Sequence, residues 1–123
     1  MELTVKEEHV NIQTDDGVMS TFTCWPDGEE QFPAVVFYMD APAIREELYD
    51  MARRIAAAGY YVILPDLFYR YGTIRFPERN QWARKVWTLI LKDLSNAMVM
   101  DDTRALFNHM DGHTAVKGGP KAC

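Results

Sequence analysis

The sequence contains few of the residues that covalent catalysis uses. Its 123 residues include two cysteines, Cys24 and Cys123, and two serines, Ser20 and Ser95. Neither serine lies in a G-x-S-x-G motif at the end of a strand, so neither has the setting of a catalytic nucleophile. The cysteines form no metal-ligand pair, the histidines lack metal-ligand spacing, and no glycine-rich nucleotide loop occurs. We therefore expect no metal and no cofactor.

Positive charge and long apolar runs are also scarce. Thirteen Lys and Arg stand against eighteen Asp and Glu, for a net charge of −5. A chain this acidic has no dense basic patch with which to bind a phosphate backbone. No apolar run has the length of a membrane span, and the first residues lack the pattern of a signal peptide. We expect a cytoplasmic protein that binds neither nucleic acid nor membrane.

What the sequence does contain suits one globular core. Apolar residues make up 48% of the chain and aromatic residues 12%, which is enough to bury one core and too little for two domains. No repeat or linker interrupts residues 1–123. The first part, Leu3–Gln13 followed by Gly17–Trp25, alternates around an Asp-Gly turn and predicts a β-hairpin.

The middle of the chain predicts a strand–helix–strand unit. Pro33–Met39 and Tyr60–Leu64 are short, apolar throughout and rich in β-formers, as in strands buried on both faces. Between them, apolar residues recur at helical spacing: Ile44, Leu48, Met51 and Ile55. A unit of this kind has parallel strands and a right-handed crossover. We therefore predict an α/β protein, a three-layer α/β/α sandwich with an N-terminal hairpin followed by parallel βαβ units.

The third part of the chain is predicted to be helical from Gln81 to about Met110. An apolar stripe runs along it at helical spacing. It comprises Trp82, Val86, Leu89, Ile90 and Leu94, with Leu106, Phe107 and Met110 after a polar stretch.

Two loops follow the two predicted parallel strands and should converge on one edge of the sheet. Met39–Ala43 follows the first strand, and Pro65–Phe68 follows the second. Ligands of open α/β sheets bind outside the carboxyl ends of the strands. A backbone N–H of such a turn, beside a helix N-terminus, can stabilise an oxyanion. Asp40 in this loop has a structural alternative, the N-cap of the following helix.

The aromatic segment Phe68–Tyr71 follows the second predicted strand directly. Its side chains Phe68, Tyr69 and Arg70 are candidates for lining a pocket. The alternative is a capping loop that packs on the edge of the sheet.

Two runs in the chain resemble the dienelactone hydrolase family of α/β-hydrolases, which cleave lactones and related esters. They are Phe37–Arg45 and Ala52–Arg70, the second with the pattern A-x-x-G-Y-x-V-x-x-P-D-L-[FY]-x-R. The later stretches Asp102–Ala105 and Gly119–Lys121 also fit. The resemblance extends from about Glu8 to Cys123 and corresponds to the first half of the family's domain, that is, an incomplete α/β-hydrolase fold ending before the nucleophile elbow.

This resemblance implies roles for particular residues. Asp40 occupies the place of an acidic residue that the family follows, three positions on, with Gly; here Ala43 replaces that Gly. The N–H of Ala41 corresponds to half of an oxyanion hole, and Arg70 to the arginine that closes the P-D-L run. The family's nucleophile, usually a Cys, lies just beyond a short strand that would include Cys123. None of the catalytic triad is then present.

Three interpretations follow. The first is a fragment of a hydrolase of lactone or ester bonds, whose full-length form takes a small-molecule ester or lactone but whose 123 residues alone are inactive. The second is a small α/β binding or oligomerisation module without catalysis. The third is an unrelated flavodoxin-like domain. Because the strand that would pair beside Pro33–Met39 is lacking, we also expect a homo-oligomer through the exposed sheet edge.

Overall fold

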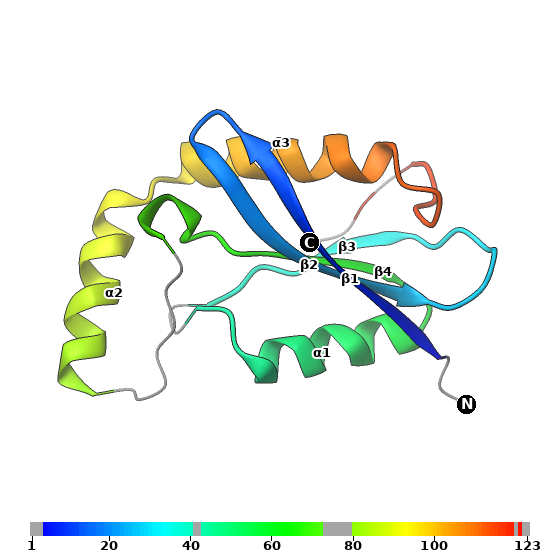
Figure 1. Ribbon diagram of the computed structural model, residues 1–123, viewed down its shortest axis with the longest axis horizontal. Helices are drawn as coiled ribbons and strands as arrows, with labels where there is room; N and C mark the ends of the chain where they lie inside the picture. Colours follow the sequence, from blue (N-terminus) through cyan, green and yellow to red (C-terminus); the bar gives the residue numbers. More distant parts are fainter. Residues whose placement is uncertain (1–3, 41–42, 73–79, 120, 122–123) are drawn as a thin grey trace.

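Four strands form one mixed sheet with helices on both of its faces (Figure 1). The computed structural model describes residues 4–40, 43–72, 80–119 and 121. The sheet has the order β1-β2-β4-β3. The elements are β1 (Val5–Thr14), β2 (Gly17–Pro26), β3 (Ala34–Val36), α1 (Glu46–Ala57), β4 (Tyr61–Pro65), the 3₁₀ turn η1 (Tyr69–Tyr71), α2 (Gln81–Asp93) and α3 (Asn96–Asp111).

The N-terminal hairpin is confirmed. β1 and β2 pair antiparallel over their whole length, with Thr14 opposite Gly17 at the turn. Gly17 has a φ of +142°, a backbone conformation that a residue without a Cβ adopts readily. The hairpin joins the rest of the sheet through β2, which runs antiparallel to β4.

The strand–helix–strand unit is also confirmed, with a shorter first strand than the sequence indicates and the second strand displaced by one residue. β3 pairs parallel with β4, and α1 connects them. The strand predicted over Pro33–Met39 is regular only at Ala34–Val36. Phe37 still donates to the carbonyl of Ile63 at 2.9 Å, and the chain then leaves the sheet.

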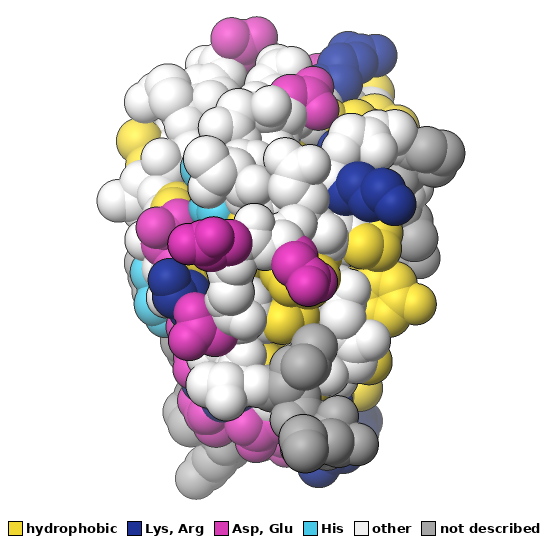
Figure 2. Space-filling model, turned by 90° about the vertical axis from the view of Figure 1, so that its right-hand side faces the viewer, with side chains coloured by type: hydrophobic (Ala, Val, Ile, Leu, Met, Phe, Trp, Pro, Cys, Tyr) yellow, Lys and Arg dark blue, Asp and Glu magenta, His cyan; other side chains and the backbone are white. Residues whose placement is uncertain are grey.

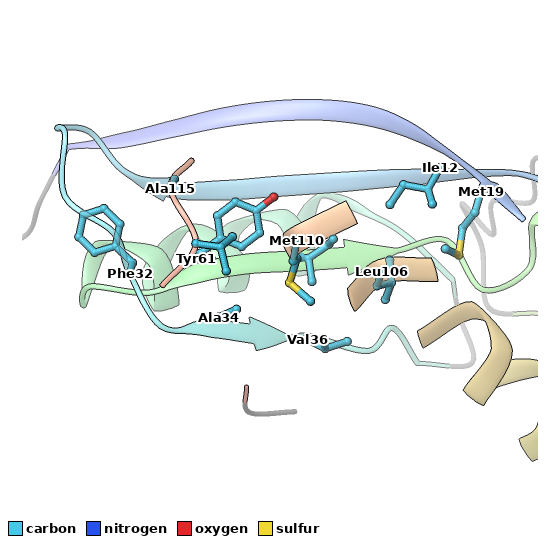
Figure 3. Packing of buried hydrophobic residues seen from close by; sticks show 11 residues of the cluster. Ile12, Met19, Phe32, Ala34, Val36, Tyr61, Leu106, Met110 and Ala115 are labelled. Atoms are coloured by element: carbon cyan, nitrogen blue, oxygen red, sulfur yellow. The ribbon is translucent and has the colours of Figure 1, made fainter. Parts of the chain in front are cut away.

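Burial of β4 on both faces produces the three layers. Tyr61 and Ile63 pack on one face with Leu106 and Met110 of α3 (Figure 3). Val62 and Leu64 pack on the other face among residues of α1, including Leu48, Ala52 and Ala56. Side chains that alternate across a strand divide the core in this way. The predicted sandwich of α1, sheet and α3 is therefore confirmed.

The single helix predicted over Gln81–Met110 is wrong, because two helices occupy this stretch. The chain is extended at Leu94, with a ψ of 116°, and Ser95 caps the next helix by accepting a hydrogen bond from the N–H of Met98 at 3.2 Å. A serine side chain that satisfies a free helical N–H is a strong helix start. The apolar residues keep their helical spacing across this break, so the spacing alone does not indicate that one helix ends and another begins.

Two residues of that stripe face solvent. Trp82 is 73% exposed and Leu89 is 68% exposed. α2 stands crosswise at one end of the sheet (Figure 1), so only a narrow side of it meets the core. Ile90 and Ala83 are its buried residues, and Ile90 packs with Phe68.

β3 lies at the outer edge of the sheet. The carbonyl of Pro33 accepts a hydrogen bond from the N–H of Tyr61, and the N–H of Phe37 donates to the carbonyl of Ile63. Because the hydrogen-bonding direction alternates along a strand, the amide groups of Ala34 and Val36 point away from β4. Just before β3, Phe32 forms a parallel bridge with Val116. No further strand lies beside β3 among the residues that the structure describes.

Candidate functional site: the carboxyl edge of the sheet

The loop after β3 is held by an ion pair. Arg45 donates from both terminal nitrogens to the carboxylate of Asp40, with Nη2 at 3.1 Å from Oδ2, and its Nη1 also contacts the carbonyl oxygen of Ala43 at 3.2 Å. The hydrogen bond to Asp40 raises the pKa of the Arg45 guanidinium. A fork of this kind restrains both ends of a six-residue loop.

Ala43 has the backbone conformation that a glycine adopts at low cost. Its φ is +70°, its N–H donates to the carbonyl of Asp40 at 3.0 Å, and its side chain is fully buried. A left-handed conformation costs a residue with a Cβ about 1–2 kcal/mol. The loop thus has a turn suited to glycine although alanine occupies the position.

Asp40 is not a helix N-cap. α1 begins at Glu46 and its N-cap is Arg45, which makes no side-chain capping bond. The structural alternative for Asp40 is therefore wrong, and its carboxylate is paired with Arg45 instead. The other candidate of this loop, Ala41, lies outside the described residues, as does Cys123.

The segment after β4 begins with a buried turn. The carboxylate of Asp66 accepts the N–H of Phe68 at 3.1 Å, and both side chains are almost fully buried. Phe68 packs with Ala43 and Ile90 in a small cluster of its own. The two loops therefore meet, as the sequence predicts, through Phe68 and Ala43. Phe68 is a core residue of this contact.

Tyr69 and Arg70 join three elements through one buried carboxylate. Asp102 of α3 is fully buried and accepts hydrogen bonds from the Tyr69 hydroxyl at 2.7 Å and from both terminal nitrogens of Arg70 at 2.9 Å. Arg70 also pairs with Asp16 at 2.7 Å, and the Tyr69 hydroxyl contacts Thr14 at 2.7 Å. These contacts tie the η1 turn to the hairpin and α3, as expected of a capping loop.

The surroundings set the protonation of these groups. Burial, together with the hydrogen bond to Asp102, raises the pKa of Tyr69 to about 12, so its hydroxyl stays protonated at neutral pH. Burial lowers the pKa of Arg70, but its contacts with Asp102 and Asp16 outweigh this and raise it overall. Both Tyr69 and Arg70 therefore keep their protons near neutral pH.

A polar cleft of about 390 Å³ lies beside this network. Arg70 is at its wall, so one of the three pocket candidates lines a cleft. The lining residues come from the hairpin turn, η1 and α3: Gln13, Thr14, Asp15, Asp16, Arg70, Asp101, Asp102, Arg104, Ala105 and Asn108.

Sequence reasoning missed two residues of this edge, Arg45 and Asp102. Arg45 lies within the quoted run Phe37–Arg45, and Asp102 opens the stretch Asp102–Ala105, but neither position indicated an ion pair. A signal existed for Asp102, because an acidic residue flanked by the helical stripe of α3 needs a buried partner. Arg45 had no such signal, since an arginine near a helix start is ordinary.

Cys24 is not placed to act as a nucleophile. Cys24 is fully buried on the α1 side of the sheet, and burial raises the pKa of its thiol to about 12. A thiol in this setting is a poor nucleophile. Within the described ranges, no three His, Cys, Asp or Glu side chains gather as a metal site, and no helix is long and apolar enough to cross a membrane.

A mixed sheet between two helical layers, with loops converging at the carboxyl ends of its parallel strands, places the chain in the class of three-layer α/β proteins. The sequence pattern described as "Dienelactone hydrolase family" matches residues 19–119. The chain belongs to this family.

The chain is also similar to individual known proteins. The chain is 26% identical over 96 residues to a protein of Methylorubrum extorquens named "Putative carboxymethylenebutenolidase", covering 78% of this chain and 32% of that protein. It superposes on a crystal structure from Klebsiella pneumoniae named "Putative Dienelactone Hydrolase" with a TM-score of 0.78 and 19% identity, covering 93% of this chain and 46% of the other.

A dienelactone hydrolase-like promiscuous phosphotriesterase from metagenomic libraries gives a TM-score of 0.71 with 15% identity, covering 96% of this chain and 47% of the other. These structural likenesses show the fold alone. The chain spans about a third of the length of the curated relative and just under half of these two solved structures.

Proposed function

We propose that this chain forms part of a hydrolase of the dienelactone hydrolase type that cleaves carboxylic ester or lactone bonds. The observation that carries the proposal is the family match over residues 19–119 together with the clamped loop at the carboxyl end of β3. Loops at this edge of an α/β sheet bind ligands. A small-molecule ester or lactone is the proposed substrate.

The loop's proposed part in the reaction is to present a backbone donor to the oxyanion. Ala41 lies between Asp40 and Ala43, whose positions are restrained by Arg45 and by the left-handed turn. A preorganised N–H aimed at a developing oxyanion lowers the barrier to acyl transfer. No serine or cysteine of the printed sequence lies in a nucleophile elbow, so we propose that the nucleophile and its partners are supplied by residues beyond these 123.

The test compares the protein from its native source with the isolated chain. Its intact mass is measured, and both samples are assayed with an aryl ester and a five-membered lactone. We expect the native protein to exceed 14.2 kDa and to hydrolyse at least one substrate, and the isolated chain to show no turnover. A native protein of 14.2 kDa without turnover would contradict the proposal.

Two substitutions in the active protein then examine the loop. Asp40→Ala removes the carboxylate that both terminal nitrogens of Arg45 bind, leaving Glu47 as its ion-pair partner, and should lower kcat/KM by about 10- to 100-fold, because displacing a positioned group by about 1 Å has this effect. Asp27→Ala is the matched control, since Asp27 is exposed in the turn after β2 and, among the described residues, its side chain pairs with Lys6 alone. Equal losses of kcat/KM in the two variants would show that the loop after β3 does not contribute to the active site.

The second candidate function is an oligomerisation module without catalysis. The outward amide groups of Ala34 and Val36 on β3 favour it, because a strand edge that no described strand covers can pair with another copy. Sedimentation of the isolated chain distinguishes this possibility: a stable dimer that Ala34→Pro abolishes would support pairing through β3.

A further inference from the structure

His113 lies at the end of the sheet opposite to the candidate site. It follows α3 directly, and its ring packs against Trp25 of β2 at 4.9 Å and Tyr61 of β4 at 5.0 Å between centroids. Its side chain is 16% exposed. Figure 2 views the molecule from this end, where histidine and acidic side chains lie near one another on the surface. The imidazole is thus packed in the protein but within reach of solvent protons.

The Nδ1 atom of His113 accepts a hydrogen bond from the backbone N–H of Ala115, at 3.1 Å. A ring nitrogen accepts only when it carries no proton, so the neutral ring has its proton on Nε2. Nε2 lies 3.9 Å from Oε1 of Glu8 on β1. The two nitrogens therefore face different partners, an amide donor and a carboxylate.

The amide of Ala115 belongs to the segment that touches the outer edge of the sheet. Phe32 donates to the carbonyl of Ala115 at 2.8 Å, and Lys117 donates to the carbonyl of Phe32 at 2.8 Å. Among the described residues this pair of bonds makes the only bridge on that side of β3. What holds Ala115 in place also holds the segment against the sheet.

We propose that His113 is an acid-sensitive latch that holds Ala115–Lys117 on Phe32 when neutral and releases this segment when protonated. A proton taken from solvent by Nδ1 points at the N–H of Ala115, so the acceptor is lost and two donors face each other. The imidazolium keeps its place because Nε2 then pairs with the carboxylate of Glu8. The segment after His113 loses the hydrogen bond to Nδ1, and what then holds it is the bond from the N–H of Val116 to the carbonyl of His113 at 3.2 Å and the packing of Ala115 and Val116 in the core.

The surroundings of His113 determine the pH range. Burial is the largest influence and lowers its pKa, Glu8 of β1 raises it, and His109 of α3 lowers it; Trp25 and Tyr61 carry no charge at neutral pH. Because the pKa in the folded protein is below the ordinary 6.5, the fold favours the neutral ring. The latch is therefore complete above pH 6.5 and weakens as the pH falls below it.

Amide hydrogen exchange tests the latch residue by residue. Protection of the Ala115 and Lys117 amides, corrected for intrinsic exchange, should fall by at least about tenfold between about pH 7.5 and pH 5. His113→Asn keeps an acceptor oxygen near the Nδ1 position and does not titrate, so its protection should stay constant. His9→Gln, a substitution on β1, should retain the response of the unsubstituted chain.

Two outcomes would overturn the proposal: protection that is equal at both pH values in the unsubstituted chain, or an acid loss that persists in His113→Asn. A nitrogen chemical-shift measurement of His113 does not depend on the variant folding. It should show an unprotonated Nδ1 at neutral pH, and a protonated Nδ1 there would also exclude the latch.

Discussion

The two ends of the sheet hold buried polar groups in opposite ways. Near the carboxyl end of β4, the carboxylate of Asp102 accepts three hydrogen bonds from Tyr69 and Arg70. At the other end, Tyr61 Oη and His109 Nε2 are buried without a hydrogen-bond partner among the described residues. The three hydrogen bonds to Asp102 give η1 and α3 a rigid frame, although Nε of Arg45, in the loop after β3, is also buried without a hydrogen-bond partner among the described residues.

The largest expected effect comes from breaking the paired end at Asp102. Asp102→Ala leaves the guanidinium of Arg70, which is 10% exposed, with Asp16 as its remaining ion-pair partner. Removing one member of a buried pair costs about 3–5 kcal/mol. Urea denaturation measures this loss, and Asp101→Ala on the same helix, whose pair with Arg104 is exposed, should cost less than about 1 kcal/mol. Similar costs for both variants would mean that the network contributes little.

Two tyrosines, Tyr69 near the candidate site and Tyr61 at the opposite end of the sheet, test the same contrast with a smaller change. Tyr69→Phe removes a hydroxyl bonded to Asp102 and Thr14 and should cost about 1.5–3 kcal/mol. Tyr61→Phe removes a buried hydroxyl without a partner among the described residues and should leave stability unchanged or raise it by up to about 1 kcal/mol. Thermal unfolding measures the stability of both variants. A larger loss of stability for Tyr61→Phe than for Tyr69→Phe would contradict the contrast between the two ends of the sheet.

The smallest effect concerns the loop at Ala43. In Ala43→Gly, relief of a left-handed conformation worth about 1–2 kcal/mol offsets the lost methyl and the freer unfolded chain, so stability should hardly change. Ala52→Gly, at an equally buried position in α1, should cost about 2 kcal/mol. Denaturation midpoints of the two variants should differ accordingly, and equal shifts would show that Ala43 is not strained.

Much of the fold was predictable because its signals are local. The Asp-Gly turn specified the hairpin, and the all-apolar run at Tyr60–Leu64 indicated a strand covered on both faces, which the structure has at Tyr61–Pro65. The division of Gln81–Met110 was not predicted, although Ser95 followed by Asn96 is a helix start. A continuous apolar stripe outweighed that signal, and the exposure of Trp82 depends on how α2 stands against the sheet.

The candidate site was predictable in its place but not in its contacts. Asp40 and Arg70 were found from their positions after parallel strands, because parallel strands end at the same edge of the sheet and so bring their following loops there. Their partners, Arg45 and Asp102, could not be found, since ion pairing depends on which side chains the folded layers bring within about 3 Å.

The sequence by itself determined the class of fold, the edge that carries the loops and the family. These depend on periodicity, turn residues and a continuous motif, all of which act between neighbours in the chain. Tertiary structure alone decided that Arg70 is tied to Asp102, that Ala43 adopts a glycine-like turn, and that His113 meets the amide of Ala115. Such contacts arise from packing geometry in which a shift of about 1 Å makes or breaks a hydrogen bond.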